Sequence, residues 1–549
     1  MLFGAPAQTV DDAPQGKGGE GRRSPSSLSL PRLVIAGLAG DSGKTVVSLG
    51  LLAAWRKSGL VRRFAVFKKG PDYIDAAWLG WAAGSGSIGV GVGGGGGMAR
   101  NLDVHLMGEE TVTRSFVTHA VEVEAEVSLI EGNRGLYDGL DAAGSASTAA
   151  LAKLLRAPVL LVVSVPKTTA TVAALVLGCQ KLDPGVDIAG VVLNRVAGAR
   201  HERVCREAIE RHAGIPVLGA IPRFEGADVL PGRHLGLVTP AEHPSLDQVR
   251  DRIGDLVANH VDIGRLLDVA RAACPLSSSV SVSFVAAAEQ VATEQVAAAS
   301  DAGSAARRSL SIGYFRDSAF TFYYPENLEA LERAGAVLQP ISALTDPVLP
   351  PIDLLYIGGG FPETHAEQLA ANRALMDRVK AAVEDGLPVY AECGGLMYLA
   401  EQVKTIDGKS HRQSGVLPIG IEVSSSPRGH GYCELCVDTP NPFFAVGTEL
   451  RGHEFHYSHI VAGQERVASA YAVTRGTGCF GRRDGLTYRN VLASYAHLHA
   501  LGAPEWAESL CRSARIVASA TTAATTTAAA MATAKACVGQ EGRKTTCRL

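Results

Sequence analysis

Two short segments of the sequence place reactive side chains where a strand would run into a helix. The first, residues 37–45, reads Gly-Leu-Ala-Gly-Asp-Ser-Gly-Lys-Thr. A glycine-rich turn in this setting points backbone N–H groups at a phosphate, while Lys44 supplies a positive charge and the hydroxyl of Thr45 can bind Mg²⁺. Gly37 lies one residue farther from Gly43 than in the standard P-loop. The segment therefore predicts a phosphate site built on a longer variant of that loop; a glycine-rich connection that binds nothing is the alternative.

The second segment, Glu-Cys-Gly-Gly-Leu-Met at residues 392–397, also follows an apolar run. A cysteine on such a turn is lifted out of the sheet, and we expect the helix N-terminus to lower the pKa of Cys393 so that thiolate is available. The glycines at 358–360 could supply N–H groups that stabilise an oxyanion. His497 is the best candidate to move the proton, and His456 is the rival. A small buried cysteine without chemistry is the alternative.

Acidic residues follow two other apolar runs. Glu131 closes Val-Ser-Leu-Ile, so its carboxylate should emerge beside Lys44 at the carboxyl edge of the sheet, where ligands collect in open α/β sheets. Asp72 and Asp75 lie in Lys-Lys-Gly-Pro-Asp-Tyr-Ile-Asp at 68–75. We interpret Glu131 as a magnesium ligand, with a solvated charge at the end of the strand as the alternative. We interpret the two aspartates as ligands of Mg²⁺ or as groups that orient a substrate carboxylate. The alternative for the aspartates is a capped helix start with Asp75 as the cap.

Two series of short apolar runs supply the strands that must carry these turns. The first series alternates with helical segments and contains Leu33–Ala36, Phe64–Phe67, Val127–Ile130, Pro158–Val163, Ile188–Leu193 and Val217–Ala220. The second contains Leu310–Tyr314, Leu354–Ile357 and Pro388–Ala391, with helices near Pro325–Ala334 and His365–Glu384. Such alternation indicates a parallel sheet covered on both faces. The expected fold class is α/β, with two domains that each form an open, mostly parallel sheet with helices on both faces.

Shifts in composition predict where these domains begin and end. At 549 residues, with 46% hydrophobic residues, the chain is long enough for two cores. Polar and low-complexity stretches predict a disordered N-terminal extension at 1–31, a surface insertion at 84–97, a linker at 271–308 and a disordered tail at 518–549. A nucleotide- and substrate-binding domain would then span 32–270, and the cysteine domain would span 309–517.

Charge and composition also exclude several classes of protein. Lys and Arg total 52 against 55 Asp and Glu, so the net charge of -3 creates no field that would gather nucleic acid or an anionic membrane. No apolar run reaches the roughly 20 residues that span a bilayer. Cys433 and Cys436 form a CxxC without a second pair or a histidine at zinc-site spacing. We expect a cytoplasmic protein that binds small molecules; if residues 1–31 are a transit peptide, the alternative is a plastid or a mitochondrion.

Several segments, in their order along the chain, resemble the cobyrinic acid a,c-diamide synthase family from Arg32 to about Ser513. The most specific are Lys-Gly-Pro-Asp-Tyr-Ile-Asp at 69–75, Asn-Leu-Asp at 101–103, residues 131–139, Tyr-Ile-Gly-Gly-Gly-Phe-Pro-Glu at 356–363 and Ala-Glu-Cys-Gly-Gly-Leu-Met at 391–397. The resemblance implies an N-terminal ATP-binding domain of the P-loop NTPase type, similar to dethiobiotin synthetase. It implies a class I glutamine amidotransferase domain at the C-terminal end.

The resemblance also implies a role for each candidate residue. Cys393 would be the nucleophile of a glutaminase and His497 its base, without the third acid of a usual triad. ATP would be held by Gly40, Ser42, Gly43, Lys44 and Thr45, with Asn194 reading the adenine. Mg²⁺ would be held by Thr45 and Glu131, and the carboxylates of a tetrapyrrole would meet Asp72, Tyr73 and Asp75.

The activity implied is the ATP- and glutamine-dependent amidation of the a- and c-side-chain carboxylates of cobyrinic acid in cobalamin biosynthesis. It would proceed through an acyl phosphate and through ammonia released at the cysteine, along an enclosed path between the domains. The partners would be the tetrapyrrole, glutamine and ATP, and a homodimer is compatible with this chemistry. Hydrogenobyrinic acid, nickel sirohydrochlorin and siroheme are alternative acceptors. A P-loop ATPase switch with a noncatalytic amidotransferase domain is the alternative class.

Overall fold

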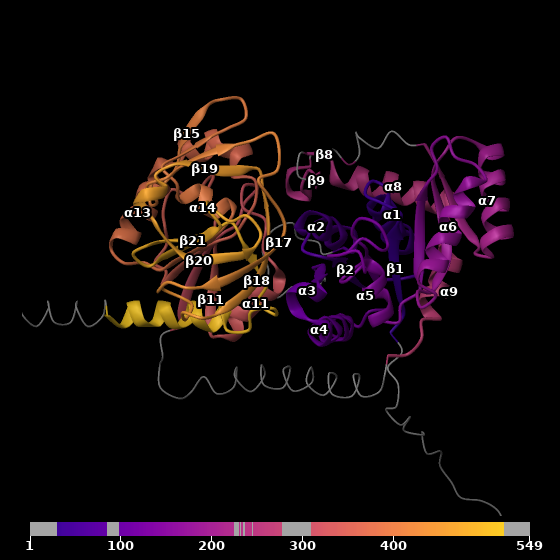
Figure 1. Ribbon diagram of the computed structural model, residues 1–549, viewed down its shortest axis with the longest axis horizontal. Coiled ribbons are helices and arrows are strands. Elements are labelled where there is room, and N and C mark those ends of the chain that lie inside the picture. Colours follow the sequence, from indigo (N-terminus) through magenta and orange to yellow (C-terminus); the bar gives the residue numbers. More distant parts are fainter. Residues whose placement is uncertain are drawn as a thin grey trace, which may run out of the picture.

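The computed structural model describes residues 30–84, 98–223, 230, 232–233, 236–243, 245–276 and 309–520. The predictions for the N-terminal extension, the insertion, the linker and the tail fall wholly or mostly outside these residues. Figure 1 shows two α/β bodies side by side, the first in indigo to magenta and the second in orange to yellow. None of the helices in the described ranges combines the length and the apolar character needed to cross a bilayer.

The first body is built on a sheet of seven parallel strands, in the order β3-β2-β4-β1-β5-β6-β7. Its strands are β1 (Arg32–Gly37), β2 (Phe64–Lys69), β3 (Arg100–Leu102), β4 (Val127–Glu131), β5 (Val159–Ser164), β6 (Ile188–Val196) and β7 (Val217–Pro222). All six predicted runs of this series form strands of the sheet. β1 lies near its centre, so the turn that follows β1 opens at the carboxyl edge between neighbouring strands.

Helices cover both faces of this sheet because successive strand residues point to opposite sides. Leu33 and Ile35 of β1 belong to one buried cluster, and Val34 and Ala36 belong to the other. The first face is covered by α1 (Lys44–Lys57), α2 (Tyr73–Ala82), α8 (Leu246–His260) and α9 (Ile263–Arg271). The second face is covered by α3 (Val104–Met107), α4 (Glu109–Glu122), α5 (Thr148–Leu154), α6 (Thr171–Leu182) and α7 (Ala199–Ala213). A short pair, β8 (Gly232–Arg233) and β9 (Gly236–Leu237), and the 3-10 turn Pro240–Glu242 precede α8.

The second body is built on a mixed sheet in the order β11-β10-β12-β13-β22-β21-β20-β17-β18-β23. The strands from β11 to β22 pair in parallel, and the remainder pair antiparallel. They are β10 (Leu310–Phe315), β11 (Ala336–Ile341), β12 (Leu354–Ile357), β13 (Val389–Glu392), β17 (Gly429–Val437), β18 (Glu449–His456), β20 (Ala468–Arg475), β21 (Arg483–Tyr488), β22 (Val491–Ser494) and β23 (His497–Leu498). The α/β fold class in two domains is thus confirmed. The second sheet also has an antiparallel half, which was not predicted from the sequence.

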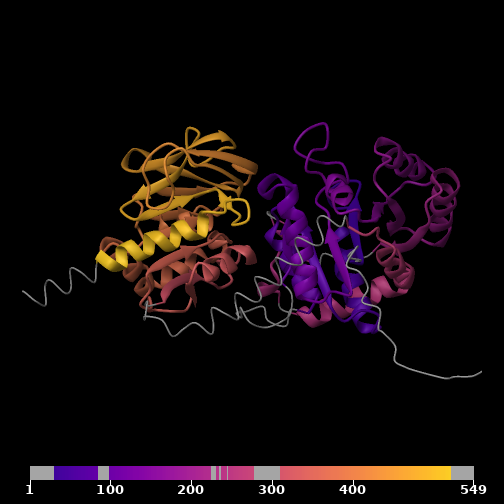
Figure 2. The same cartoon turned by 90° about the horizontal axis from the view of Figure 1, so that it is seen from below.

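A smaller sheet and several helices complete this body. The small sheet contains β14 (Gln402–Lys404), β15 (Ser410–Arg412), β16 (Gly420–Val423) and β19 (Ser458–Ala462). The helices are α11 (Pro325–Arg333), α12 (Ala366–Ala371), α13 (Arg373–Glu384), α14 (Gly394–Leu399) and a helix over 506–520, which lies along the second body in yellow in Figure 2. The prediction of a single helix over His365–Glu384 is wrong, because the helix is interrupted at Asn372. Its side chain donates hydrogen bonds of 2.9 Å to the carbonyls of Ala343 and Asp346.

Charged and polar pairs join the two bodies where α2 and α3 face α11 and β18 (Figure 1). Arg100 of β3 forms ion pairs of 3.6 Å with Glu326 and 2.7 Å with Glu329, both on α11. Asp103, the N-cap of α3, accepts a hydrogen bond of 2.6 Å from the hydroxyl of Tyr432 in β17. The Asn-Leu-Asp segment that the sequence analysis singled out therefore lies at the interface between the bodies.

Candidate active sites

The glycine-rich turn after β1 has the backbone of a phosphate loop. Gly43 adopts the left-handed region with a φ of 96°, which a residue with a side chain rarely adopts. The ammonium of Lys44 lies across the turn and donates to the carbonyls of Ala39 at 3.1 Å and Arg134 at 2.8 Å. Burial lowers the pKa of Lys44, and the nearby ammonium of Lys68 adds to this effect. A phosphate at this turn would restore the environment that favours the charged form.

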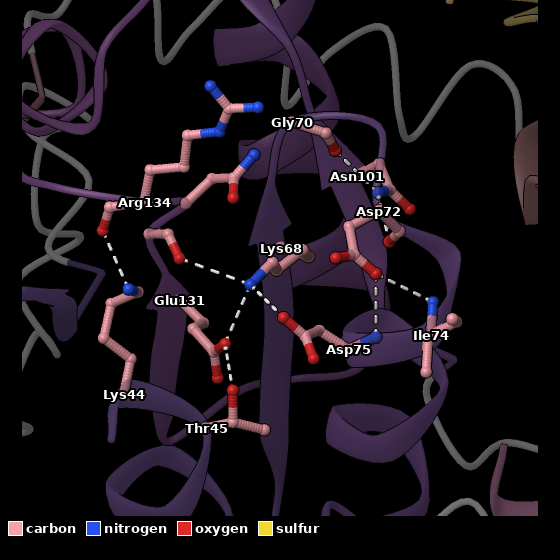
Figure 3. Close-up of polar contacts among 12 residues, drawn as sticks. Lys44, Thr45, Lys68, Gly70, Asp72, Ile74, Asp75, Asn101, Glu131 and Arg134 are labelled. Atoms are coloured by element: carbon pink, nitrogen blue, oxygen red, sulfur yellow. Dashed lines mark hydrogen bonds and ion pairs between the residues drawn. The ribbon is translucent and has the colours of Figure 1, made fainter. Parts of the chain in front are cut away.

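Lys68, at the end of β2, is the centre of the charged cluster in Figure 3. Its ammonium lies 2.5 Å from Asp75 Oδ2 and 2.8 Å from Glu131 Oε1, and the hydroxyl of Thr45 donates to the same Glu131 oxygen at 2.9 Å. Burial works to lower the pKa of Lys68, but the attraction of Asp75 and Glu131 more than offsets burial and raises it. Lys68 is therefore a buried lysine whose surroundings favour the charged form.

Lys68 is not among the site residues expected from the sequence, although it lies in the Lys-Lys-Gly-Pro-Asp segment. The signal that could have found it is register: β2 and β4 are parallel neighbours, and Lys68 pairs with Glu131. A lysine and a glutamate that end two adjacent buried strands must neutralise each other. Recognising this required the order of the strands, which the sequence analysis did not predict.

Asp72 caps α2, so the capped helix start given as the alternative is present, but its cap is Asp72 and not Asp75. The carboxylate of Asp72 accepts hydrogen bonds of 2.9 Å from the backbone N–H groups of Ile74 and Asp75. The turn before it leaves Asp72 extended, with φ -76° and ψ 117°, as an N-cap requires, whereas Asp75 is already inside the helix. Asn101 holds this turn by donating to the carbonyls of Gly70 at 2.7 Å and Asp72 at 3.0 Å. Burial, together with the charge of Asp75, raises the pKa of Asp72 to about 6.

The donor set at Thr45 and Glu131 fits a magnesium ion. Mg²⁺ prefers oxygen ligands and is usually held by one or two protein groups together with phosphate and water. Glu131 is fully buried, and among the described residues its Oε2 has no hydrogen-bond partner. No cluster of three or more His, Cys, Asp or Glu side chains in the described ranges has the form of a metal site. A magnesium ion here would therefore take most of its ligands from nucleotide and water.

Two other predicted residues of the ATP site lie in the same turn, and a third, Asn194 of β6, packs on it. Ser42 is buried and bonds to the backbone of Ala39, whereas a Cβ on Gly40 would meet nothing within 4 Å. Asn194 donates to the carbonyl of Ser42 at 2.9 Å, and its amide nitrogen would lie 2.1 Å from a Cβ on Gly43. Asn194 thus packs directly on the turn; its role with adenine stays a prediction.

Cys393 occupies the strained turn between β13 and α14. Its φ of 46° and ψ of -94° are unusual for a residue with a side chain and are typical of a nucleophile elbow. The sulfur lies 3.9 Å from the carbonyl of Phe455, and only 5% of the residue is exposed. Burial, together with the carboxylate of Glu363, raises the pKa of Cys393. The expected lowering is wrong, because α14 has only six residues and burial outweighs its N-terminus.

His497 lies beside the glycine segment that also contacts the cysteine turn. A Cβ on Gly359 would lie 2.5 Å from Cε1 of His497, and a Cβ on Gly394 would lie 3.4 Å from the carbonyl carbon of Gly359. The ring stacks on His453 at 4.9 Å, and its Nδ1 lies 3.5 Å from Glu392 Oε2. The resemblance implied no third acid, but the structure brings the carboxylate of Glu392 next to the imidazole.

His456 is held in a different environment. Its Nδ1 donates to the carbonyl of Ser458 at 2.7 Å, and its ring stacks on Tyr495 at 3.7 Å. Its Nε2 faces Glu454 at 3.6 Å. These contacts fix both nitrogens of the ring toward the protein, as expected for a histidine that supports the fold. His497 therefore stays the stronger candidate for the base.

Tyr73 joins the two sites across the domain interface. Its ring stacks on Phe322 at 5.1 Å and lies 4.5 Å from Tyr324 and 5.5 Å from His497. Tyr73 directly follows Asp72, so the ring contacts of Tyr73 connect the start of α2 with the imidazole. From the sequence, Tyr73 is expected to meet only the substrate. Tyr324 and His453 are not expected at this site, because they lie far from Tyr73 along the chain.

Comparison with known proteins agrees with this geometry. A family model described as CobQ/CobB/MinD/ParA nucleotide binding domain matches residues 33–238, and one described as CobB/CobQ-like glutamine amidotransferase domain matches residues 311–505. The chain is 44% identical to the cobyrinate a,c-diamide synthase of Magnetococcus marinus, over 88% of this chain and 97% of that protein.

Two further relatives have the same name and match over a similar length. The chain is 38% identical to the cobyrinate a,c-diamide synthase of Syntrophotalea carbinolica, over 87% of this chain and 97% of that protein. It is also 38% identical to that of Methanosarcina acetivorans, over 88% of this chain and 96% of that protein. Likeness of this extent over both domains shows that the chain is a ligase that uses glutamine as amide donor and belongs to the cobyrinate a,c-diamide synthase family.

Proposed function

We propose that the protein converts the a- and c-side-chain carboxylates of cobyrinic acid to amides, with ATP and glutamine as co-substrates. The observation that carries this proposal is the likeness to cobyrinate a,c-diamide synthases over nearly their whole length. The two candidate sites supply the two half-reactions that such an amidation needs, and they meet at one interface.

The glutaminase half-reaction begins with attack of the Cys393 sulfur on the side-chain carbonyl of glutamine. Because burial keeps the sulfur protonated, the base must take its proton as the new bond forms. His497 takes this proton and gives it to the departing ammonia, while Glu392 orients the imidazole. The N–H groups of Gly360 and Gly394 receive the oxyanion. Water then cleaves the thioester to glutamate and restores the thiol.

The second half-reaction makes the acceptor carboxylate reactive. A carboxylate oxygen of the acceptor attacks the γ-phosphorus of ATP, ADP leaves, and an acyl phosphate forms. Ammonia then attacks the acyl carbon and phosphate departs, so the amide forms without loss of hydroxide. The turn at Lys44 holds the phosphates, and Asp72 and Asp75 position the acceptor. Thr45 and Glu131 would hold Mg²⁺, which spreads the charge of the phosphates when it is bound.

Transfer of ammonia between the half-reactions has a short route in this arrangement. Tyr73 is in contact with His497 on one side and directly follows Asp72 on the other. Ammonia would be protonated and lost in bulk water, so the close approach of the two sites favours direct transfer through the interface.

The test separates the two half-reactions with two variants. Cys393→Ala should abolish amidation with glutamine and keep amidation with ammonium salts, whereas Lys44→Ala should abolish both. Cys511→Ala, another buried cysteine, is the control and should keep both. Mass spectrometry of cobyrinic acid, hydrogenobyrinic acid and nickel sirohydrochlorin after reaction counts the amides on each acceptor. The proposal would be contradicted if Cys393→Ala lost amidation with glutamine and with ammonium salts while Cys511→Ala kept both. It would also be contradicted if no acceptor stimulated the hydrolysis of ATP.

A further inference from the structure

A cavity of about 300 Å³ lies between the two bodies, beside the first turns of α2. One wall is formed by α2, with Tyr73, Ile74, Ala77 and Trp81. The opposite wall is the segment between β10 and α11, with Arg316 and Phe322. Neither the phosphate turn nor Cys393 lines this cavity, so the half-reactions derived above give it no function.

Arg316 gives the cavity a positively charged guanidinium with few hydrogen-bond partners in the protein. Among the described residues that line it, Arg316 is the only lysine or arginine, and Asp317 is the only carboxylate. Its guanidinium makes one long hydrogen bond of 3.4 Å to the carbonyl of Thr321 and lies 6.0 Å from the ring centroid of Tyr323. A guanidinium in this state can take a carboxylate through two parallel N–H donors.

The adjacent acid, Asp317, also lines the cavity, but its oxygens accept hydrogen bonds from the protein itself. Asp317 accepts hydrogen bonds from the backbone N–H groups of Ala319, Phe320 and Leu344 and from the hydroxyl of Ser342. Its carboxylate is committed to holding the loop after β10. Of the two charged groups in the wall, the Arg316 guanidinium is therefore the one with donors left for a ligand, and a ligand carboxylate suits it.

The remaining walls are aromatic and lie next to the site of carboxylate activation. Tyr73, Trp81 and Phe322 offer ring faces and edges for an extended apolar ligand. Asn101 lines the cavity and also holds the carbonyls of Gly70 and Asp72. A ligand seated against Arg316 would therefore extend along α2 toward the charged cluster at its N-terminus.

We propose that this cavity binds one edge of the tetrapyrrole acceptor, with Arg316 taking a side-chain carboxylate other than the one that is being amidated. The inference rests on the proposed function. The volume is at the lower end of ligand pockets, so it suits a pyrrole-derived ring with its side chain and not a whole macrocycle. A second anchor of this kind holds the reacting carboxylate in place at the phosphate turn.

The first test removes the charge and keeps a polar side chain with N–H donors. Arg316→Gln should raise the dissociation constant for the tetrapyrrole about tenfold to a hundredfold, the usual effect of losing a hydrogen bond to a charged group. Equilibrium dialysis without ATP and glutamine measures this constant, and Arg316→Lys should recover part of the affinity. The KM values for ATP and glutamine should stay at the wild-type level. Equal binding by wild type and Arg316→Gln would overturn the inference.

The second test fills the cavity. Ala77 is exposed on α2 in the cavity wall, and Ala77→Trp should weaken tetrapyrrole binding while glutamine hydrolysis continues. Ala381→Trp, at an exposed position of α13 far along the chain, is the matched control. If Ala77→Trp lowered glutamine-dependent amidation but left ammonia-dependent amidation and tetrapyrrole affinity intact, the cavity would be a route for ammonia and the inference would be wrong.

Failure of the inference can be told apart from failure of the proposed function. A wild-type protein that binds a tetrapyrrole but never amidates it would contradict the proposed function, while the dialysis comparison would still decide the role of Arg316. Conversely, normal amidation by wild type with unchanged affinity in Arg316→Gln would overturn only the cavity assignment.

Discussion

Replacing Gly359 by alanine should disable the glutaminase while sparing the synthetase. A Cβ at this position would lie 2.5 Å from Cε1 of His497, whereas ordinary contacts begin at 3.4 Å. The ring must therefore move by about 1 Å, and a displacement of that size costs about a hundredfold in rate. This loss corresponds to about 3 kcal/mol of transition-state stabilisation. Glutamate release should fall by that factor, whereas ammonia-dependent amidation should stay close to the wild-type rate.

Gly178→Ala is the matched control for this substitution. Gly178 lies inside α6, where a Cβ would meet nothing within 4 Å, so alanine should leave both activities unchanged and stabilise the helix by about 1 kcal/mol. Glutaminase assays with and without acceptor, run beside ammonium-supported amidation, give both rates. If Gly359→Ala released glutamate as fast as Gly178→Ala, His497 would not act at this place and the assignment of the base would be refuted.

Three further predictions concern the charged groups of the first body and its interface. Lys68→Met leaves the buried carboxylates of Asp75 and Glu131 without the ammonium between them. The free energy of unfolding, measured by urea denaturation at pH 7.5, should fall by about 3–5 kcal/mol, and this loss should shrink as acid protonates the carboxylates. An equal loss at pH 5 would contradict this. Because burial and Asp75 raise the pKa of Asp72 from 3.8 to about 6, wild type loses stability as pH rises through that range. Asp72→Asn keeps the cap but removes the titration, so it should be more stable than wild type at pH 8 by up to about 3 kcal/mol, with the gain vanishing near pH 4; a pH-independent difference would count against the raised pKa. Arg100→Ala leaves the buried carboxylate of Glu326 without its ion-pair partner and should lower the free energy of unfolding by about 3 kcal/mol. Arg412→Ala, whose partner is exposed, is the control and should change it by less than about 1 kcal/mol. Similar losses in both variants would refute the interface role of Arg100.

Local chemistry in the sequence was sufficient to predict the two reactive turns. A glycine-rich segment between a strand and a helix takes its conformation from residues within a few positions, and Gly43 and Cys393 have the unusual backbone that such turns require. The first parallel sheet was predictable for the same reason, since short apolar runs that alternate with helices leave few other arrangements. Those predictions depend on neighbours along the chain.

Features that depend on contacts between distant positions in the sequence were not predictable in this way. The antiparallel half of the second sheet, the break at Asn372 and the pairing of Lys68 with Glu131 all involve partners that lie far away in the sequence. Tyr73 and His497 are 424 positions apart and touch only because the two bodies pack against each other.

The sequence by itself determined which residues could react and on which turns they lie, because backbone conformation there is a local property. Tertiary structure decided their charge state and their partners. Cys393 illustrates the difference: its position at a helix N-terminus predicts a lowered pKa, yet burial in the folded protein raises it. Asp72 caps α2 in place of Asp75 because the preceding turn, held by Asn101, sets where the helix begins. Burial and long-range packing act on electrostatics through the whole fold, and no short segment contains them.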